Sequence, residues 1–286
     1  MNDSQTYTFD AYRFQLLPTS KEIQLRTDMP NLSYEKLVEE KNNILAEILL
    51  NKKIAFKARD SELVHTANKI TSNYIALHFG IPKKDIIEKP DFTKEEIQRY
   101  PDLKLFIDND RDEQLILIQR NYKAVSKTDS ISRLLEKSLN KYLNSYQLRI
   151  YIQPIYTEAE FWNLVEKYNK QITRLSFEFI RPNLANISGG LAEDLKSFQV
   201  DSNAHKGKLQ LEAPSKGTLE IDRKSPEING LVDYSSKGGG DISIKVKGIR
   251  KRIKTNEGTK TMEIDEVTLN NPTKAIMDSL FNSIER

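Results

Sequence analysis

The fold is decided by residues 115–180, which read LILIQRNYKAVSKTDSISRLLEKSLNKYLNSYQLRIYIQPIYTEAEFWNLVEKYNKQITRLSFEFI. Apolar runs predict three strands, separated by two segments whose apolar side chains recur every three to four residues, as in amphipathic helices. The predicted strands are residues 115–118, 148–155 and 175–180, and the predicted helices are residues 131–143 and 158–168. This order of strand and helix favours a small α/β or ferredoxin-like layer with helices packed on a sheet.

The residues before this stretch predict an opening strand and a helix. Residues 7–17 alternate and are rich in aromatic side chains, as strands are. Residues 33–50 have helical spacing, and Ser33 is suited to the N-cap. Residues 54–57 and 75–79 predict short strands around a second helical pattern at residues 63–74. Prolines and charges at residues 80–112 indicate a long loop-rich connection with one short helix at residues 93–99.

Beyond residue 183 the chain becomes rich in glycine and in short strand patterns. The expected strands are residues 209–212, 218–221, 228–234, 242–249 and 261–267. A closing helix follows Asn271 and Pro272. We therefore expect an α+β protein with a mixed-sheet layer and packed helices in residues 1–183, and a strand-rich basic domain closed by a helix in residues 184–286. The later strands could equally complete a sheet begun upstream.

Composition excludes several classes of function. The 286 residues contain no cysteine, so disulfide scaffolds, thiolate nucleophiles and iron–sulfur clusters are excluded. The three histidines lack the spacing of metal ligands, and no serine-nucleophile motif occurs. The sequence assigns no catalytic residue, no metal ligand and no cofactor. No apolar stretch is long enough to span a membrane, and residues 1–10 lack the pattern of a secretory signal, so we expect a cytoplasmic protein.

Basic residues gather in one segment, residues 237–260. This segment has eight basic and two acidic residues, a net charge of +6, whereas the whole chain carries only +3. The candidate nucleic-acid-binding residues are Lys237, Lys245, Lys247, Arg250, Lys251, Arg252 and Lys254. The three glycines at residues 238–240 lack the following Gly-Lys-Ser or Gly-Lys-Thr of a phosphate-binding loop, so they predict a flexible turn.

The spacing of this segment predicts how its charges are displayed. Apolar and basic positions alternate from Ile242, and the alternation reverses parity after Gly248. A one-residue bulge at Gly248 would keep the apolar side chains on the core side. It would place five basic side chains on one outer face: Lys245, Lys247, Arg250, Arg252 and Lys254. A turn at residues 255–258 would then form a hairpin. Such a face suits the phosphates of double-stranded DNA, although a merely solvated, charged hairpin fits the same pattern equally well.

Two carboxylate pairs suggest an alternative, a metal-dependent nuclease. Glu220 with Asp222, and Glu263 with Asp265, would each lie on one face of a strand, where they could hold a magnesium ion. Alternating polar positions on amphipathic strands produce such pairs routinely. A protein–protein adaptor is a further reading, supported only by the large charged surface.

Two segments carry a resemblance to a known group of proteins. Residues 148–155, LRIYIQPI, and residues 174–182, RLSFEFIRP, precede the basic carboxy-terminal part. This layout resembles the accessory proteins of bacterial antiphage systems, the group that includes the phage-exclusion protein RexA and the Kiwa subunit KwaB. The resemblance implies a homodimer that binds double-stranded DNA with little sequence preference beside a second defence protein. It transfers no catalytic residue to this chain.

Overall fold

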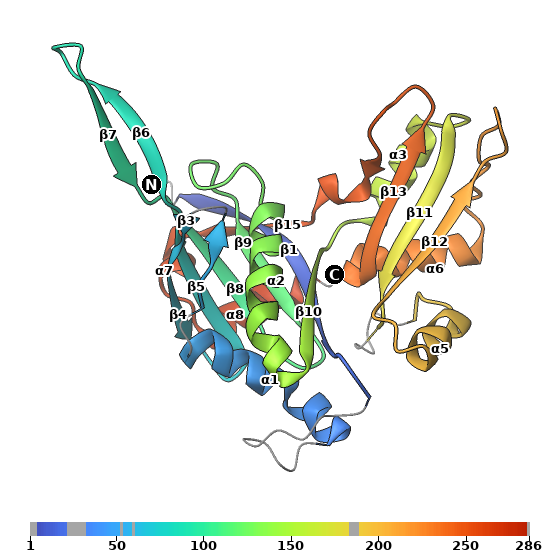
Figure 1. The fold of residues 1–286 in the computed structure, drawn as a ribbon, viewed down its shortest axis with the longest axis horizontal. Helices are drawn as coiled ribbons and strands as arrows, with labels where there is room; N and C mark the ends of the chain where they lie inside the picture. The colour runs from blue at the N-terminus through green and yellow to red at the C-terminus, as the bar shows by residue number, and fades with distance from the viewer. Residues whose placement is uncertain (1–4, 22–32, 52–53, 59–60, 183–188, 285–286) are drawn as a thin grey trace.

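The computed structural model describes residues 5–21, 33–51, 54–58, 61–182 and 189–284. These residues form two main antiparallel sheets with helices packed on them and two further two-stranded sheets, so the predicted α+β class is confirmed (Figure 1). Within the described ranges, no helix has the length and apolar character needed to cross a membrane.

The larger sheet is arranged around one long strand, β1 (Thr6–Pro18). One edge of β1 pairs with β9, and the other edge pairs with β15 along its first half and with β10 along its second half. The sheet continues from β9 through β8 and β5 to β4. Its other strands are β4 (Val64–Lys69), β5 (Tyr74–Gly80), β8 (Asp102–Asp108), β9 (Leu115–Gln119), β10 (Leu148–Pro154) and β15 (Thr261–Asp265).

Helices cover both faces of this sheet. Alternate residues of β1 point to opposite faces, so Phe14 and Leu16 join a core with α1 (Tyr34–Asn51) and α2 (Asp129–Leu143). Phe9 and Ala11 join a second core with α7 (Glu266–Asn270) and α8 (Lys274–Asn282). Two covered faces explain why the strands read as nearly continuous apolar runs.

Two segments of the amino-terminal half differ from their predicted structure. Residues 63–74 have helical spacing, but Val64–Lys69 form the edge strand β4, because pairing with β5 outweighs a weak local pattern. Residues 80–112 were expected to be a loop with one helix, and they instead contain the strand β8 and a hairpin of β6 (Lys83–Glu88) and β7 (Lys94–Arg99). The hairpin projects away from the sheet (Figure 1) and carries cross-strand ion pairs such as Lys84 with Glu96 at 2.6 Å.

The smaller sheet has the order β12-β11-β13-β14. Its strands are β11 (Ile172–Ile180), β12 (Lys206–Glu212), β13 (Gly240–Val246) and β14 (Ile253–Lys254). One face packs on α3 (Glu158–Lys167) and α6 (Pro226–Tyr234), with Phe161, Phe177 and Ile242 in the shared core. The remaining elements are β2 (Lys57–Ala58), β3 (Ser61–Glu62), α5 (Glu193–Asp201) and the short turns η1 (Asn144–Tyr146), η2 (Ser235–Gly239) and η3 (Thr255–Gly258).

The carboxy-terminal half contains more helix than its sequence pattern predicts. Residues 228–234 were expected to be a strand and lie instead in α6, where Ser225 accepts a hydrogen bond from the Ile228 amide and Pro226 occupies the first turn. Serine followed by proline is a helix-start signal that the apolar run concealed. Residues 218–221, another expected strand, form no strand. The closing helix begins at Lys274, with Thr273 as its N-cap.

The smaller sheet is an insertion between two strands of the larger one. The chain leaves the larger sheet after β10 and returns at β15, and these two points lie side by side through the bridge between Tyr156 and Thr259. Opposite them, Ala11 accepts a hydrogen bond from the Ile155 amide and donates one to the Lys260 carbonyl, both at 2.9 Å. The expected boundary at residue 183 falls between β11 and β12, which are neighbours in one sheet. Of the three strands predicted within residues 115–180, β9 and β10 belong to the larger sheet and β11 belongs to the smaller one. These three strands therefore do not form a single layer.

Arg13 of β1 fixes the inserted unit to the larger sheet. Its side chain is buried, and it donates to the Lys237 carbonyl at 2.8 Å and to the Glu113 carbonyl at 2.7 Å. Gly238 lies directly against Arg13 with φ of 86°, and a Cβ at this position would stand 2.5 Å from the Arg13 Cβ. The glycines at residues 238–240, predicted to be a flexible turn, are buried, with Gly239 against Tyr234 and Gly240 against the Glu178 backbone.

A second contact between the units passes through His205. Its Nε2 lies 2.8 Å from the Pro18 carbonyl oxygen, so Nε2 carries the proton and donates. Its Nδ1 lies 3.0 Å from the Tyr151 hydroxyl and accepts from it. Burial lowers the pKa of His205, and the nearby Arg181 and Arg149 lower it further. Burial and these two guanidinium groups therefore favour the neutral imidazole, although the hydrogen bond to Pro18 acts in the opposite direction.

Replacing Gly238 by alanine will destabilise the protein more than the same change at Gly248. Both glycines have positive φ, which costs an L-residue about 1–2 kcal/mol. At Gly238 the added methyl group would also clash with the Arg13 side chain, whereas no atom of the described residues lies within 4 Å of a Cβ at Gly248. Urea unfolding of Gly238→Ala and Gly248→Ala measures both costs, and equal losses would show that the packing against Arg13 contributes nothing.

The His205 contact will weaken as the pH falls. The unfolded chain takes up a proton near the ordinary histidine pKa of about 6.5, whereas the folded chain resists protonation, so stability is fully present above this pH and declines below it. We expect the unfolding free energy of the wild-type protein to fall more between pH 7.5 and pH 5.5 than that of His205→Phe. The same loss in both proteins would refute a role for His205.

Candidate functional site

The predicted basic hairpin has a different geometry in the structure. β13 ends at Val246, and the chain turns back to form β14, in which Lys254 pairs with Ser243. The Lys245 ammonium closes the turn by donating to the Ile249 carbonyl and, at 2.7 Å, to the Arg250 carbonyl. Gly248 therefore lies in a turn and not in a bulge, and residues 255–258 form η3 in place of the expected hairpin turn.

Three of the seven predicted binding residues are engaged in contacts within the protein. Lys237 is paired with Asp233 at 2.7 Å, and Lys254 with Asp241 at 2.6 Å. The Lys245 ammonium donates hydrogen bonds to two carbonyl groups of the turn. The other four are exposed, and none has an ion pair among the described residues: Lys247, Arg250, Lys251 and Arg252. We call residues 247–252 the basic turn, since this segment contains no carboxylate.

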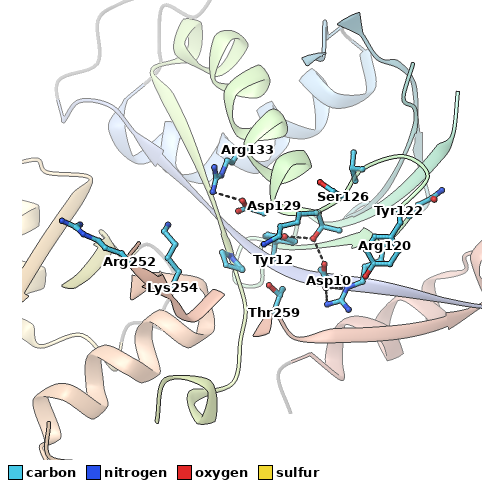
Figure 2. Close-up of a pocket in the computed structure, with 15 residues that line it drawn as sticks. Asp10, Tyr12, Arg120, Tyr122, Ser126, Asp129, Arg133, Arg252, Lys254 and Thr259 are labelled. Atoms are coloured by element: carbon cyan, nitrogen blue, oxygen red, sulfur yellow. Dashed lines mark hydrogen bonds and ion pairs between the residues drawn. The ribbon is translucent and has the colours of Figure 1, made fainter. Parts of the chain in front are cut away.

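The basic turn borders a cleft between the two units. Arg252 is part of the basic turn and also lines the cleft. The cleft has a volume of about 680 Å³. Arg252 and Lys254 form the wall contributed by the inserted unit, and Figure 2 shows them on the opposite side of the cleft from Arg120 and Tyr122, with the Arg252 guanidinium directed outward. The other lining residues are Asp10, Tyr12, Arg120, Asn121, Tyr122, Val125, Ser126, Lys127, Thr128, Asp129, Arg133, Pro154 and Thr259.

A buried polar network forms one wall of the cleft. Arg120 donates from Nε to Asp10 at 2.8 Å, and its Nη2 lies 2.6 Å from the same carboxylate oxygen. Thr128 donates to the other oxygen of Asp10, so it must accept from the Tyr12 hydroxyl, which lies 2.9 Å away. Burial raises the pKa of Tyr12, and this phenol stays protonated. The hydrogen bond and charge of Asp10 raise the pKa of Arg120 above its ordinary value. These groups shape the wall and leave no free base or nucleophile.

The cleft carries a net positive charge. Its lining contains five basic side chains and two carboxylates, a net charge of +3. Arg133 is paired with Asp129 at 2.7 Å, whereas Lys127 and Arg252 are exposed and have no ion pair among the described residues. The amino terminus of α2 also lies at the cleft, where its dipole adds partial positive charge that Asp129 offsets. The arrangement is suited to binding an anion.

The cations of residues 120–133 were not among the predicted site residues. In the sequence this segment reads RNYKAVSKTDSISR, directly after a buried strand. Its four basic residues and one tyrosine give a detectable signal of a basic connection with an aromatic residue in it. Their meeting with Arg252, about 120 positions later, depends on the insertion topology and has no local signal.

The carboxylate pairs of the nuclease hypothesis lie in ordinary structural settings. Glu220 and Asp222 lie outside any strand, and Asp222 accepts from the Lys224 amide at 2.8 Å. Asp265 is the N-cap of α7 and accepts from the Thr268 amide and hydroxyl. In the described part of the chain, no three histidine or acidic side chains gather as metal ligands.

The comparisons with known proteins give no family assignment. No family model matches the sequence, and no curated protein is significantly similar to it.

Proposed function

We propose that this protein binds DNA with little sequence preference, through the cleft and the basic turn. One observation carries the proposal: two units that are distant in sequence each contribute to one cleft an exposed cation with no ion pair among the described residues. Lys127 approaches from the connection before α2, and Arg252 from the turn between β13 and β14.

The arrangement favours a polymer of phosphates over a single small anion. The exposed cations extend from the cleft along the basic turn, and a chain of phosphates can contact several of them at once. Neutralising each phosphate releases condensed counterions, which makes such binding tight at low salt and independent of sequence. The exposed basic turn is accessible to the backbone of double-stranded DNA.

Reversing two cleft charges will weaken DNA binding. For Lys127→Glu with Arg252→Glu, we expect at least a tenfold loss of affinity for a random-sequence duplex. The salt dependence, as the slope of log K against log salt, should become shallower by about 2, since about one counterion is released for each lost phosphate contact. Fluorescence anisotropy titrations at 50 and 200 mM salt measure both quantities.

The matched control is Lys69→Glu with Lys83→Glu. These lysines are exposed and lie outside the cleft, and the change in net charge is the same. The control should bind DNA nearly as the wild type does. An equal loss in both double variants would attribute binding to overall charge and would remove the cleft from the proposal.

The nuclease and adaptor alternatives have no observation of their own in the structure. A place in antiphage defence is a proposal that the layout resemblance supports, through residues 148–155 and 174–182. In that setting the chain would act as a homodimer beside a second defence protein.

The homodimer is open to a direct test. Light scattering of the purified protein distinguishes the 33.0 kDa chain from a species of twice that mass. We expect the dimer at micromolar concentration, and a monomer throughout the concentration range would contradict it.

A further inference from the structure

Tyr122 is an exposed aromatic ring at the edge of the cleft. Its side chain is 76% exposed, and Figure 2 shows it beside Arg120 on the wall opposite Arg252 and Lys254. No ring contact or hydrogen bond of the Tyr122 side chain occurs within the described part of the chain. The fold therefore does not need this ring for packing.

The backbone around Tyr122 is held in place. The Asn121 carbonyl accepts from the amides of Ala124 and Val125, both at 2.9 Å. The Asn121 side chain donates to the Asp102 carbonyl at 2.7 Å and accepts from the Lys123 amide at 3.0 Å. These bonds tie the tyrosine's turn to β8, so the ring is presented from a fixed backbone.

The size of the cleft limits what can enter it. A volume of about 680 Å³ lies within the usual range for small-molecule sites, roughly 300–1,000 Å³. One or two nucleotides fit this space. A duplex, whose major groove alone is about 12 Å wide, can contact the rim and the basic turn but cannot occupy the cleft.

We propose that the cleft holds an unpaired segment of DNA, with a base stacked on Tyr122 and the flanking phosphates on Lys127 and Arg252. This inference rests on the proposed function and narrows its substrate to DNA with single-stranded character. Aromatic rings beside a basic groove bind single strands without reading their sequence, because every base has a π-face. Paired bases are not accessible for such stacking.

The test compares a blunt duplex with the same duplex carrying an unpaired overhang of six nucleotides. The wild-type protein should bind the overhang substrate about tenfold more tightly at equal salt. Tyr122→Ala should remove this preference by weakening binding of the overhang substrate, whereas Tyr122→Phe should keep the preference. Tyr100→Ala is the matched control, since Tyr100 is also exposed and lies outside the cleft.

A fluorescent base analogue in the overhang reports stacking directly. Its emission should be quenched on binding to the wild type and to Tyr122→Phe, but not to Tyr122→Ala. Equal wild-type affinity for the two substrates, or an equal loss on both in Tyr122→Ala, would overturn the stacking proposal while duplex binding stands. Absence of binding to either substrate at 50 mM salt would overturn the proposed function together with it.

Discussion

The pairing of β1 with three partners is the constraint on which the rest of the structure depends. Its thirteen residues meet β15 and β10 end to end on one edge and β9 on the other. Because β10 and β15 share one edge of β1, the chain must leave and return at the same place, near Ala11. The inserted unit is therefore attached by two adjacent strands, and Arg13 on the same strand fixes it through η2.

The cleft is a consequence of that attachment. The inserted unit stands beside the larger sheet, so β14 and the connection before α2 form opposite walls. Among the described residues, each wall alone has few cations without an ion pair, as an ordinary solvated surface does. On the α2 side Arg120 and Arg133 are paired with carboxylates, and on the β14 side Lys254 is. Lys127 and Arg252 line one cleft only because the topology places them around the same space.

The sequence predicted elements well where local pattern and tertiary pairing agree. The residues of β1, α1, β9, α2 and β10 form the strands and helices that their sequence patterns predict. The prediction of β4 was wrong because strand pairing with β5 outweighs the local helical pattern. The prediction of α6 was wrong because apolar residues concealed the helix-start signal. The predicted geometry of the basic segment was wrong, because the Lys245 ammonium closes a turn that alternation cannot reveal. Pairing between strands 100 or more residues apart has no local signature.

The insertion also imposes an order on folding during synthesis. All four strands of the inserted sheet lie between Ile172 and Lys254, so that unit can be complete before β15 is synthesised. β1 is made first, yet part of its edge waits for Thr261–Asp265. Until then the first half of β1 exposes unpaired backbone groups, which makes this edge the part of the nascent chain most open to pairing with a wrong strand.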